Sequence, residues 1–292
     1  MGADLYEAYP AFKEILDSAQ VDFDLKTVSF TDPDGVLNQT EYTQPCMVAF
    51  AAGMTAILAQ LGITPDYAAG LSLGEYSALQ CAGVFTPAQA ISLAAFRGKA
   101  MASAAAGMAC GMTAVLGLDR EKLQQACDQA ADAGVVEIAN YNCPGHLVIG
   151  GQKEAVDKAA ALAKELGAKR CMPLKVSGPF HTSLLRPAGD SLREKFREIT
   201  FGTPRFPVLF NCLGREMGEN DTIPALLEKQ VQSSVYMEDT IRRLEELGVD
   251  TIVEIGPGKA LSGFVKKTAP SIKTYAVGIC ADIDALAAAL KG

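Results

Sequence analysis

Three residues of one short segment have the spacing of a catalytic turn. Gly70, Ser72 and Gly74 form Gly-x-Ser-x-Gly, which is typical of a nucleophile elbow between a strand and a helix. Glycines flank such a serine because larger side chains would collide in the sharp turn. At the N-terminus of the helix, the N–H of Leu73 could donate to a developing oxyanion. Because glycine and serine are also common in ordinary turns, the motif alone leaves a plain strand–turn–helix junction equally open.

A serine nucleophile needs a base, and the sequence contains only two histidines, His146 and His181. His146 follows a turn at residues 142–145, where an ordinary polar residue is expected. His181 lies in a loop at residues 177–183, between a predicted strand and a predicted helix, where functional side chains are commonly displayed. A neighbour of a helix N-cap is the alternative interpretation of His181. We therefore expect His181 to be the partner of Ser72.

The middle of the chain has the pattern of a small, separate domain. Residues 112–176 alternate apolar strand-like runs with two amphipathic segments, in the order βαββαβ. That order is typical of a ferredoxin-like unit. It lies between two larger portions in which strands and helices alternate, so the sequence predicts an inserted small domain at 112–176.

The flanking portions predict an α/β domain that would present Ser72 and His181. Strands alternating with helices imply a parallel sheet covered on both faces. We therefore expect a large, hydrolase-like parallel-sheet domain made of residues 1–111 and 177–292. The helices predicted there cover residues 1–20, 43–61, 73–81, 87–101, 183–198, 223–231 and 237–247, and the strands cover 65–70, 207–211, 251–255 and 275–279.

Composition narrows the class of protein. The net charge of −8 argues against non-specific nucleic-acid binding, and no apolar run reaches the length of a membrane span. The eight cysteines form no Cys-x-x-Cys pair and fall mostly in apolar segments, as expected for reduced cysteines of a cytoplasmic protein. With only two histidines, a metal site of the usual kind is not expected.

Five motifs, in this order and spacing, resemble the malonyl-CoA:acyl carrier protein transacylase family from end to end. The motifs are Gly70-Leu71-Ser72-Leu73-Gly74-Glu75, Phe96-Arg97-Gly98-Lys99, Asn140-Tyr141-Asn142-Cys143-Pro144-Gly145, Gly178-Pro179-Phe180-His181 and Glu254-Ile255-Gly256-Pro257-Gly258-Lys259. The position of His181, with 111 residues after it, differs from the near-terminal histidine of lipases and esterases. The family's fold, an α/β hydrolase-like domain with a ferredoxin-like insert, agrees with the elements predicted above.

The resemblance implies a role for each matching residue. Ser72 would attack the thioester of malonyl-CoA, and His181 would take its proton and return it to the departing thiol. A backbone carbonyl, here that of Gln230, would orient the imidazole, although a solvated glutamine at a helix end is the alternative. The N–H of Leu73 would help to bind the oxyanion.

Substrate and partner contacts are also implied by the resemblance. Arg97 would hold the free malonyl carboxylate through a two-pronged ion pair, whereas base rates favour an exposed side chain for a lone arginine. Asn142 would contact the substrate, and Phe180 would exclude an α-methyl branch. Lys266 and Lys267 would meet an acidic acyl carrier protein, or they are simply a solvated helix face.

One part of the family pattern has no counterpart in this sequence. Relatives begin with a strand ending in Phe-Pro-Gly-Gln-Gly, whose glutamine N–H is the second oxyanion donor, whereas Met1 aligns with the helix that follows. Two alternatives to a working transacylase therefore stay open: a serine thioesterase or esterase, and an impaired acyltransferase-like binding protein. We expect a monomer without a cofactor, acting on malonyl-CoA and acyl carrier protein, and binding neither nucleic acid nor membrane.

Overall fold

The computed structural model describes residues 1–291, which form two compact units. The first contains residues 1–98, 201–209 and 244–292, and the second contains residues 99–200 and 210–243. The second unit includes the whole of the predicted small domain together with flanking segments. The predicted domain boundaries at 112 and 176 stay a prediction, because a compact unit can contain an inserted domain together with residues that flank it.

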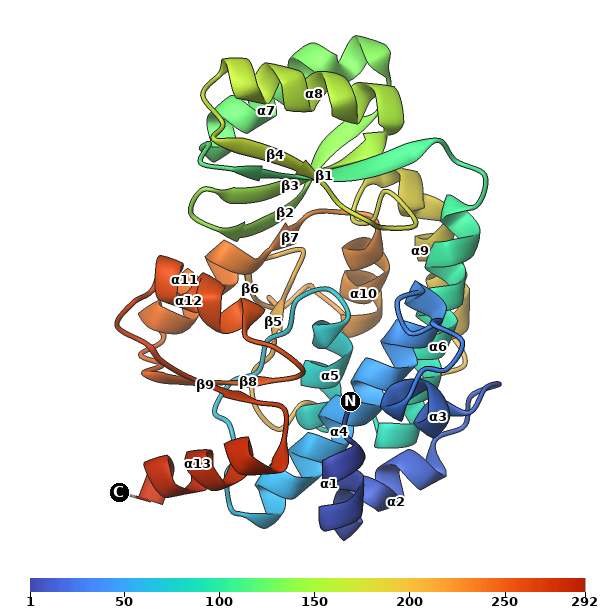
Figure 1. Cartoon of the computed structure of the whole chain (residues 1–292), viewed down its shortest axis with the longest axis vertical. Coiled ribbons are helices and arrows are strands. Elements are labelled where there is room, and N and C mark those ends of the chain that lie inside the picture. Colours follow the sequence, from blue (N-terminus) through green and yellow to red (C-terminus); the bar gives the residue numbers. More distant parts are fainter. Residues whose placement is uncertain (292) are drawn as a thin grey trace. The chain divides into compact units, whose positions relative to one another are not determined.

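The second unit is built on a five-stranded sheet in the order β4-β1-β3-β2-β7 (Figure 1). Its strands are β1 (Cys110–Leu116), β2 (Val136–Cys143), β3 (His146–Gln152), β4 (Arg170–Pro173) and β7 (Val235–Tyr236). Strand β1 pairs antiparallel with β3 and β4, and β2 pairs antiparallel with β3 and parallel with β7. The first four strands have the order of a ferredoxin-like sheet, which confirms the predicted βαββαβ unit.

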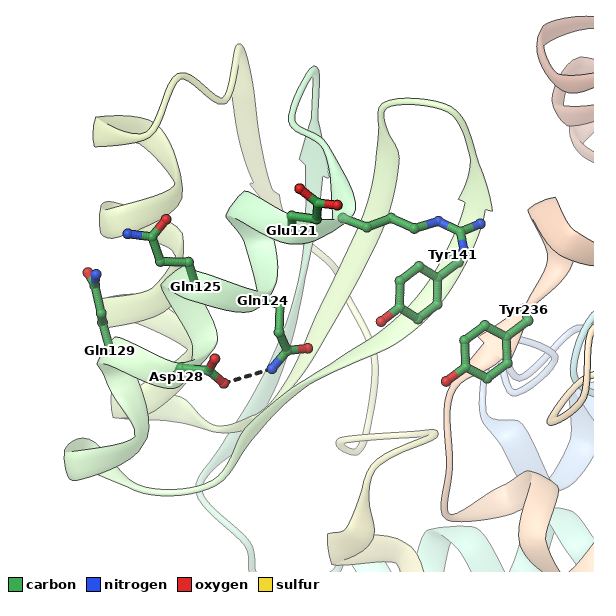
Figure 2. A pocket seen from close by; sticks show the side chains of 8 residues that line it. Glu121, Gln124, Gln125, Asp128, Gln129, Tyr141 and Tyr236 are labelled. Atoms are coloured by element: carbon green, nitrogen blue, oxygen red, sulfur yellow. Dashed lines mark hydrogen bonds between the residues drawn. The ribbon is translucent and has the colours of Figure 1, made fainter.

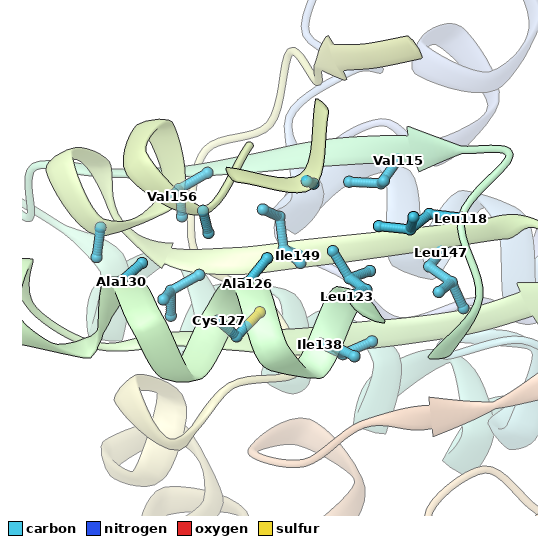
Figure 3. Packing of buried hydrophobic residues seen from close by; sticks show 14 residues of the cluster. Val115, Leu118, Leu123, Ala126, Cys127, Ala130, Ile138, Leu147, Ile149 and Val156 are labelled. Atoms are coloured by element: carbon cyan, nitrogen blue, oxygen red, sulfur yellow. The ribbon is translucent and has the colours of Figure 1, made fainter. Parts of the chain in front are cut away.

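Two helices, α7 (Arg120–Ala130) and α8 (Lys153–Glu165), cover one face of this sheet (Figure 1). Helix α7 is capped by Asp119, whose side chain accepts a hydrogen bond from the N–H of Lys122 at 2.8 Å. Figure 3 shows the apolar side chains packed between helices and sheet, among them Val115, Leu123 and Ile149, which are less than 1% exposed. This apolar core fixes the two helices against the sheet that contains β2.

The other elements that lie wholly in the second unit are the 3-10 turns Ala131–Ala133 and Ser183–Leu185, the helices α9 (Arg186–Phe196) and α10 (Ile223–Val231), and the short strand β6 (Arg215–Glu216). Three elements cross from one unit to the other along the chain: α6 (Pro87–Ala105), β5 (Leu209–Phe210) and α11 (Met237–Glu246).

The first unit is organised around α4 (Thr40–Gln60), which has the length and composition of a membrane-crossing helix. Of its most apolar window, 61% is buried within the protein, as in the core helix of a globular unit. The other elements of this unit are α1 (Ala3–Ala8), α2 (Pro10–Ser18), α3 (Leu25–Phe30), α5 (Gly74–Cys81), β8 (Thr251–Ile255), α12 (Ala260–Thr268), β9 (Lys273–Val277) and α13 (Cys280–Lys291). Strands β8 and β9 are parallel and joined by α12, which agrees with the predicted α/β class.

Some predicted elements differ from the structure for local reasons. The single helix predicted over 1–20 is broken at Tyr9, which has an extended backbone, and α2 starts at Pro10. A residue before proline avoids the helical region, and proline favours the first helical position. The strand predicted at 65–70 is reduced to one parallel bridge between Ala68 and Val208, and helix α3 was not predicted.

Candidate active site

The turn at Ser72 has the strained backbone of a nucleophile elbow. Ser72 has φ +52°, in the left-handed region that serine adopts only when its surroundings enforce it, at a cost on the order of 1–3 kcal/mol. Gly70 makes the turn possible, because a Cβ there would lie 2.1 Å from the carbonyl carbon and oxygen of Gly74. Gly74 itself has nothing within 4 Å of such a Cβ, so the two glycines are not equivalent. Leu73 is the N-cap residue of α5, and its N–H lies at the helix N-terminus.

Arg97 is buried beside this turn. Its guanidinium is 1% exposed and donates through Nη2 to Ser72 Oγ at 3.1 Å and through Nη1 to Gln44 Oε1 at 2.7 Å. The cation also lies 5.5 Å from the ring centre of Tyr76. Burial lowers the pKa of Arg97, an effect opposed by Tyr76 and Glu75, and a guanidinium remains charged at physiological pH. The expectation that a lone arginine is exposed is therefore wrong for Arg97.

The helix carrying Arg97 approaches α4 closely, and this explains the contact with Gln44. A Cβ on Gly98 would lie 2.8 Å from Thr40 O, so only glycine lets the two helices meet at this point. Gln44 in turn donates to Thr40 Oγ1 at 2.7 Å and is 4% exposed. Sequence reasoning missed Gln44, although a polar residue inside the apolar stretch 43–61 is the signal that could have found it.

The ring of His181 is held by the second unit. Its Nδ1 lies 2.9 Å from the backbone oxygen of Gln230, in the last turn of α10, and the side chain of His181 is 4% exposed. Since a carbonyl oxygen only accepts, Nδ1 carries the proton in the neutral ring and Nε2 is left basic. The contact implied by the resemblance is thus present, and it comes from the backbone of Gln230.

His181 shares its unusual backbone with Ser72. Only three non-glycine residues of the described chain, Asp32, Ser72 and His181, have positive φ, and His181 has φ +62°. Within its loop, Thr182 Oγ1 donates to Pro179 O at 2.6 Å. Strained backbone at non-glycine residues tends to gather at functional sites, and two of these three residues are the ones that the sequence motifs indicate.

The other predicted site residues fall into two groups. Asn142 lies on β2 and is buried, and its Oδ1 accepts no hydrogen bond within residues 1–291. Phe180 packs against a small cluster on the sheet face opposite α7, made of Met112, Ala114, Ala139 and Val148. Lys266 and Lys267 are exposed in the last turn of α12. No cluster of metal-ligating residues occurs among the described residues.

An open pocket lies elsewhere, beside α7 (Figure 2). It measures about 620 Å³, and its wall includes stacked rings of Tyr141 and Tyr236, 4.9 Å apart, with Arg120 over Tyr141 at 4.8 Å. Burial raises the pKa of Tyr141 to about 12, so its hydroxyl stays neutral at physiological pH. Arg120 also forms a two-pronged ion pair with Asp239. No residue predicted to take part in catalysis lines this pocket.

Comparison with known proteins identifies the family of this chain. Residues 1–283 match the acyl transferase domain family. The chain belongs to this family. It is therefore an acyltransferase with an α/β fold, and the predicted fold class is confirmed.

Individual relatives agree along almost the whole chain. This chain is 41% identical over 280 residues to the malonyl CoA-acyl carrier protein transacylase of Bacillus subtilis (strain 168). The match covers 95% of this chain and 88% of that protein. The crystal structure of the enzyme of that name from Clostridium perfringens superposes with a TM-score of 0.96 at 36% identity, covering 100% of this chain and 92% of that one. A malonyl-transacylase in complex with a type II PKS acyl-carrier protein superposes with a TM-score of 0.95 at 36% identity, covering 99% and 93% of the two chains.

Proposed function

We propose that this acyltransferase moves the malonyl group of malonyl-CoA to the phosphopantetheine thiol of an acyl carrier protein, as a step of fatty-acid synthesis. The reaction passes through a malonyl ester on Ser72. The names of the relatives, including one solved with a carrier protein, support this substrate and this partner.

The buried Arg97 is the observation that carries the proposal. A fixed cation 3.1 Å from Ser72 Oγ suits an acyl group that ends in a carboxylate, because a guanidinium binds a carboxylate through two parallel hydrogen bonds. An esterase for neutral acyl groups gains nothing from a positive charge at the acylated serine. A contact of this kind in a dry site contributes about 1.5–3 kcal/mol.

The tautomer of His181 decides which ring nitrogen takes and returns the proton. In the first half, Ser72 Oγ attacks the thioester carbonyl while Nε2 of His181 takes the serine proton, and the C–S bond breaks as CoA leaves with that proton. In the second half, the carrier thiol gives its proton to Nε2 and its sulfur attacks the ester, and Ser72 recovers the proton. The Gln230 carbonyl keeps the other nitrogen protonated, and the N–H of Leu73 donates to the oxyanion.

Further contacts follow from the same proposal. Asn142 would donate to or accept from the substrate, and Phe180 would limit the space beside the α-carbon. Lys266 and Lys267 would attract acidic side chains of the carrier protein. Changing both lysines to glutamate should raise the KM for carrier protein several-fold while leaving the rate of Ser72 acylation unchanged.

The cysteine content and the net charge bear on the setting of the reaction. Malonyl-CoA acts as substrate, and no separate cofactor is needed for the two steps. We place the reaction in the cytoplasm, which the eight free cysteines support, and we propose a monomer that binds neither nucleic acid nor membrane, as the net charge of −8 suggests.

Mass spectrometry of the protein mixed with malonyl-CoA tests the proposal. We expect a malonyl adduct on Ser72 that forms within one turnover, disappears when carrier protein is added, and is absent from Ser72→Ala. A thioesterase would release free malonate without any carrier protein, and a binding protein with an impaired site would show no adduct. Either result would overturn the transferase assignment.

A further inference from the structure

Strand β2 makes a long-range contact with the loop that carries His181. The carboxylate of Glu137 accepts two hydrogen bonds from Ser183, one from the backbone N–H at 2.7 Å and one from Oγ at 2.6 Å. Ser183 is two residues after His181, while Glu137 is 46 residues earlier than Ser183 in the chain. The two bonds use both carboxylate oxygens, so they fix the direction of the loop as well as its position.

Strand β2 also contacts the segment that follows Gln230, whose carbonyl is the acceptor for His181. Ser234 Oγ donates to the backbone oxygen of Ile138 at 2.6 Å, and Val235 pairs with Asn140 in the parallel ladder. These residues follow Gln230 by four and five positions. Residues 137–140 of β2 therefore connect to both partners of the bond between His181 Nδ1 and Gln230 O.

The backbone conformation of His181 needs support from outside its loop. Phe180 packs on the sheet on one side of His181, and Ser183 is bonded to β2 on the other side. A positive φ at a histidine is tolerated only where the surroundings over-determine it. The bond from Thr182 to Pro179 lies inside the loop and cannot anchor it to the sheet. The bonds from Ser183 to Glu137 do anchor it.

We infer that Glu137 is a positioning residue for His181: by holding Ser183, it keeps the imidazole on the Gln230 carbonyl and Nε2 in the basic form. Glu137 does not touch the reacting atoms and acts only through the loop. The kinetic part of this inference rests on the proposed function, whereas the tautomer of His181 does not.

Substitutions at the two ends of the contact should have graded effects. Glu137→Ala removes both acceptors, and Glu137→Gln keeps one oxygen and turns an amide N–H₂ toward a donor. Ser183→Ala removes one bond and leaves the N–H in place. Glu154→Gln is the matched control, because Glu154 is an exposed glutamate in the first turn of α8, on the same unit.

Nitrogen NMR of the histidine rings tests the tautomer directly. The chain has only two histidines, so the spectrum of His146→Gln assigns the signals of His181. We expect the wild type and Glu154→Gln to show His181 protonated on Nδ1. Glu137→Ala should show a mixture of tautomers, with a smaller change in Glu137→Gln and Ser183→Ala. An unchanged His181 tautomer in Glu137→Ala, at an unchanged melting temperature, would overturn the inference.

Kinetics separates this inference from the proposed function. Glu137→Ala should lower kcat for malonyl transfer about 10- to 100-fold with KM within a factor of two, the size expected from a small misplacement of a catalytic group. If the wild type transfers no malonyl group, the proposed function fails while the tautomer result still stands. If transfer is normal in both wild type and Glu137→Ala, the positioning role fails alone. Should Glu137→Ala not fold, the same readings are taken from Glu137→Gln and Ser183→Ala.

Discussion

The turns at Ser72 and His181 share a left-handed backbone but are held in opposite ways. The turn at Ser72 is set by neighbours within four residues, since a Cβ on Gly70 would meet the backbone of Gly74. The turn at His181 depends on partners about fifty residues away, Gln230 through the ring and Glu137 through Ser183. A local constraint leaves a readable motif, whereas a long-range one leaves none.

Ser72 and His181 also differ in the chemical group that contacts each of them. Ser72 lies beside a buried guanidinium, which offers positive charge to a substrate. His181 lies on a carbonyl, which offers only an acceptor and so fixes which nitrogen is basic. The first arrangement suits selection of an acyl group, and the second suits movement of a proton. Breaking either should therefore give a different kinetic signature.

The largest effect should come from the proton carrier. His181→Ala should lower the rate of malonyl transfer about 10⁴-fold or more, the scale of losing a member of a serine–histidine pair. Initial rates with malonyl-CoA and carrier protein measure this. His146→Ala is the control and should behave as the wild type, because His146 is the first residue of β3 and lies outside the loop that carries His181. Normal turnover in His181→Ala would remove the histidine from the mechanism.

The next effect should come from the local constraint at the elbow. Gly70→Ala places a methyl group 2.1 Å from Gly74 atoms, so we expect a loss of about 1–3 kcal/mol or more in the free energy of unfolding and a slower acylation of Ser72. Gly74→Ala has open space and should change stability by less than about 1 kcal/mol. Thermal unfolding of the pair is the measurement. Equal stability of the two variants would contradict the difference between the glycines.

Much of the fold could be predicted because its signals are local. The helix after Asp119 starts where its cap predicts, and Thr86 and Gln89 exchange the two hydrogen bonds of a capping box at the start of α6. The strand predicted at 251–255 is β8 with the same bounds. The break at Tyr9 was missed because helical spacing outweighed the proline signal in the sequence.

The candidate site was only partly readable for the same reason. The spacing around Ser72 predicts the elbow, and a count of histidines leaves His181 as its partner. The burial of Arg97 contradicts the base rate and depends on Gly98, whose role is visible only when α4 is packed against α6. Gln44 and Glu137 act across more than forty residues, so no motif spacing reveals their contacts, and only the polar character of Gln44 inside the apolar stretch 43–61 indicates a special role.

A smaller effect, on selectivity, should come from Arg97. Arg97→Ala should reduce the preference for malonyl-CoA over acetyl-CoA by about 10- to 150-fold, which corresponds to about 1.5–3 kcal/mol for a charge-assisted contact. Arg97→Lys should recover only part of it, since an ammonium lacks the fork geometry. Competition between the two thioesters for acylation of Ser72 gives the ratio. An unchanged ratio in Arg97→Ala would separate the guanidinium from substrate selection.

The smallest effect should come from Gln230, and it sharpens the contrast between side-chain and backbone support. The acceptor for His181 is the Gln230 backbone oxygen, which survives any substitution that keeps α10 folded. Gln230→Met, similar in size, should therefore lower kcat less than about 10-fold, far less than His181→Ala, with His181 still protonated on Nδ1. Steady-state rates and ring NMR check this together. A loss as large as that of His181→Ala with the tautomer unchanged would mean that the buried amide of Gln230 itself takes part, and the division of roles between the two turns would then be wrong.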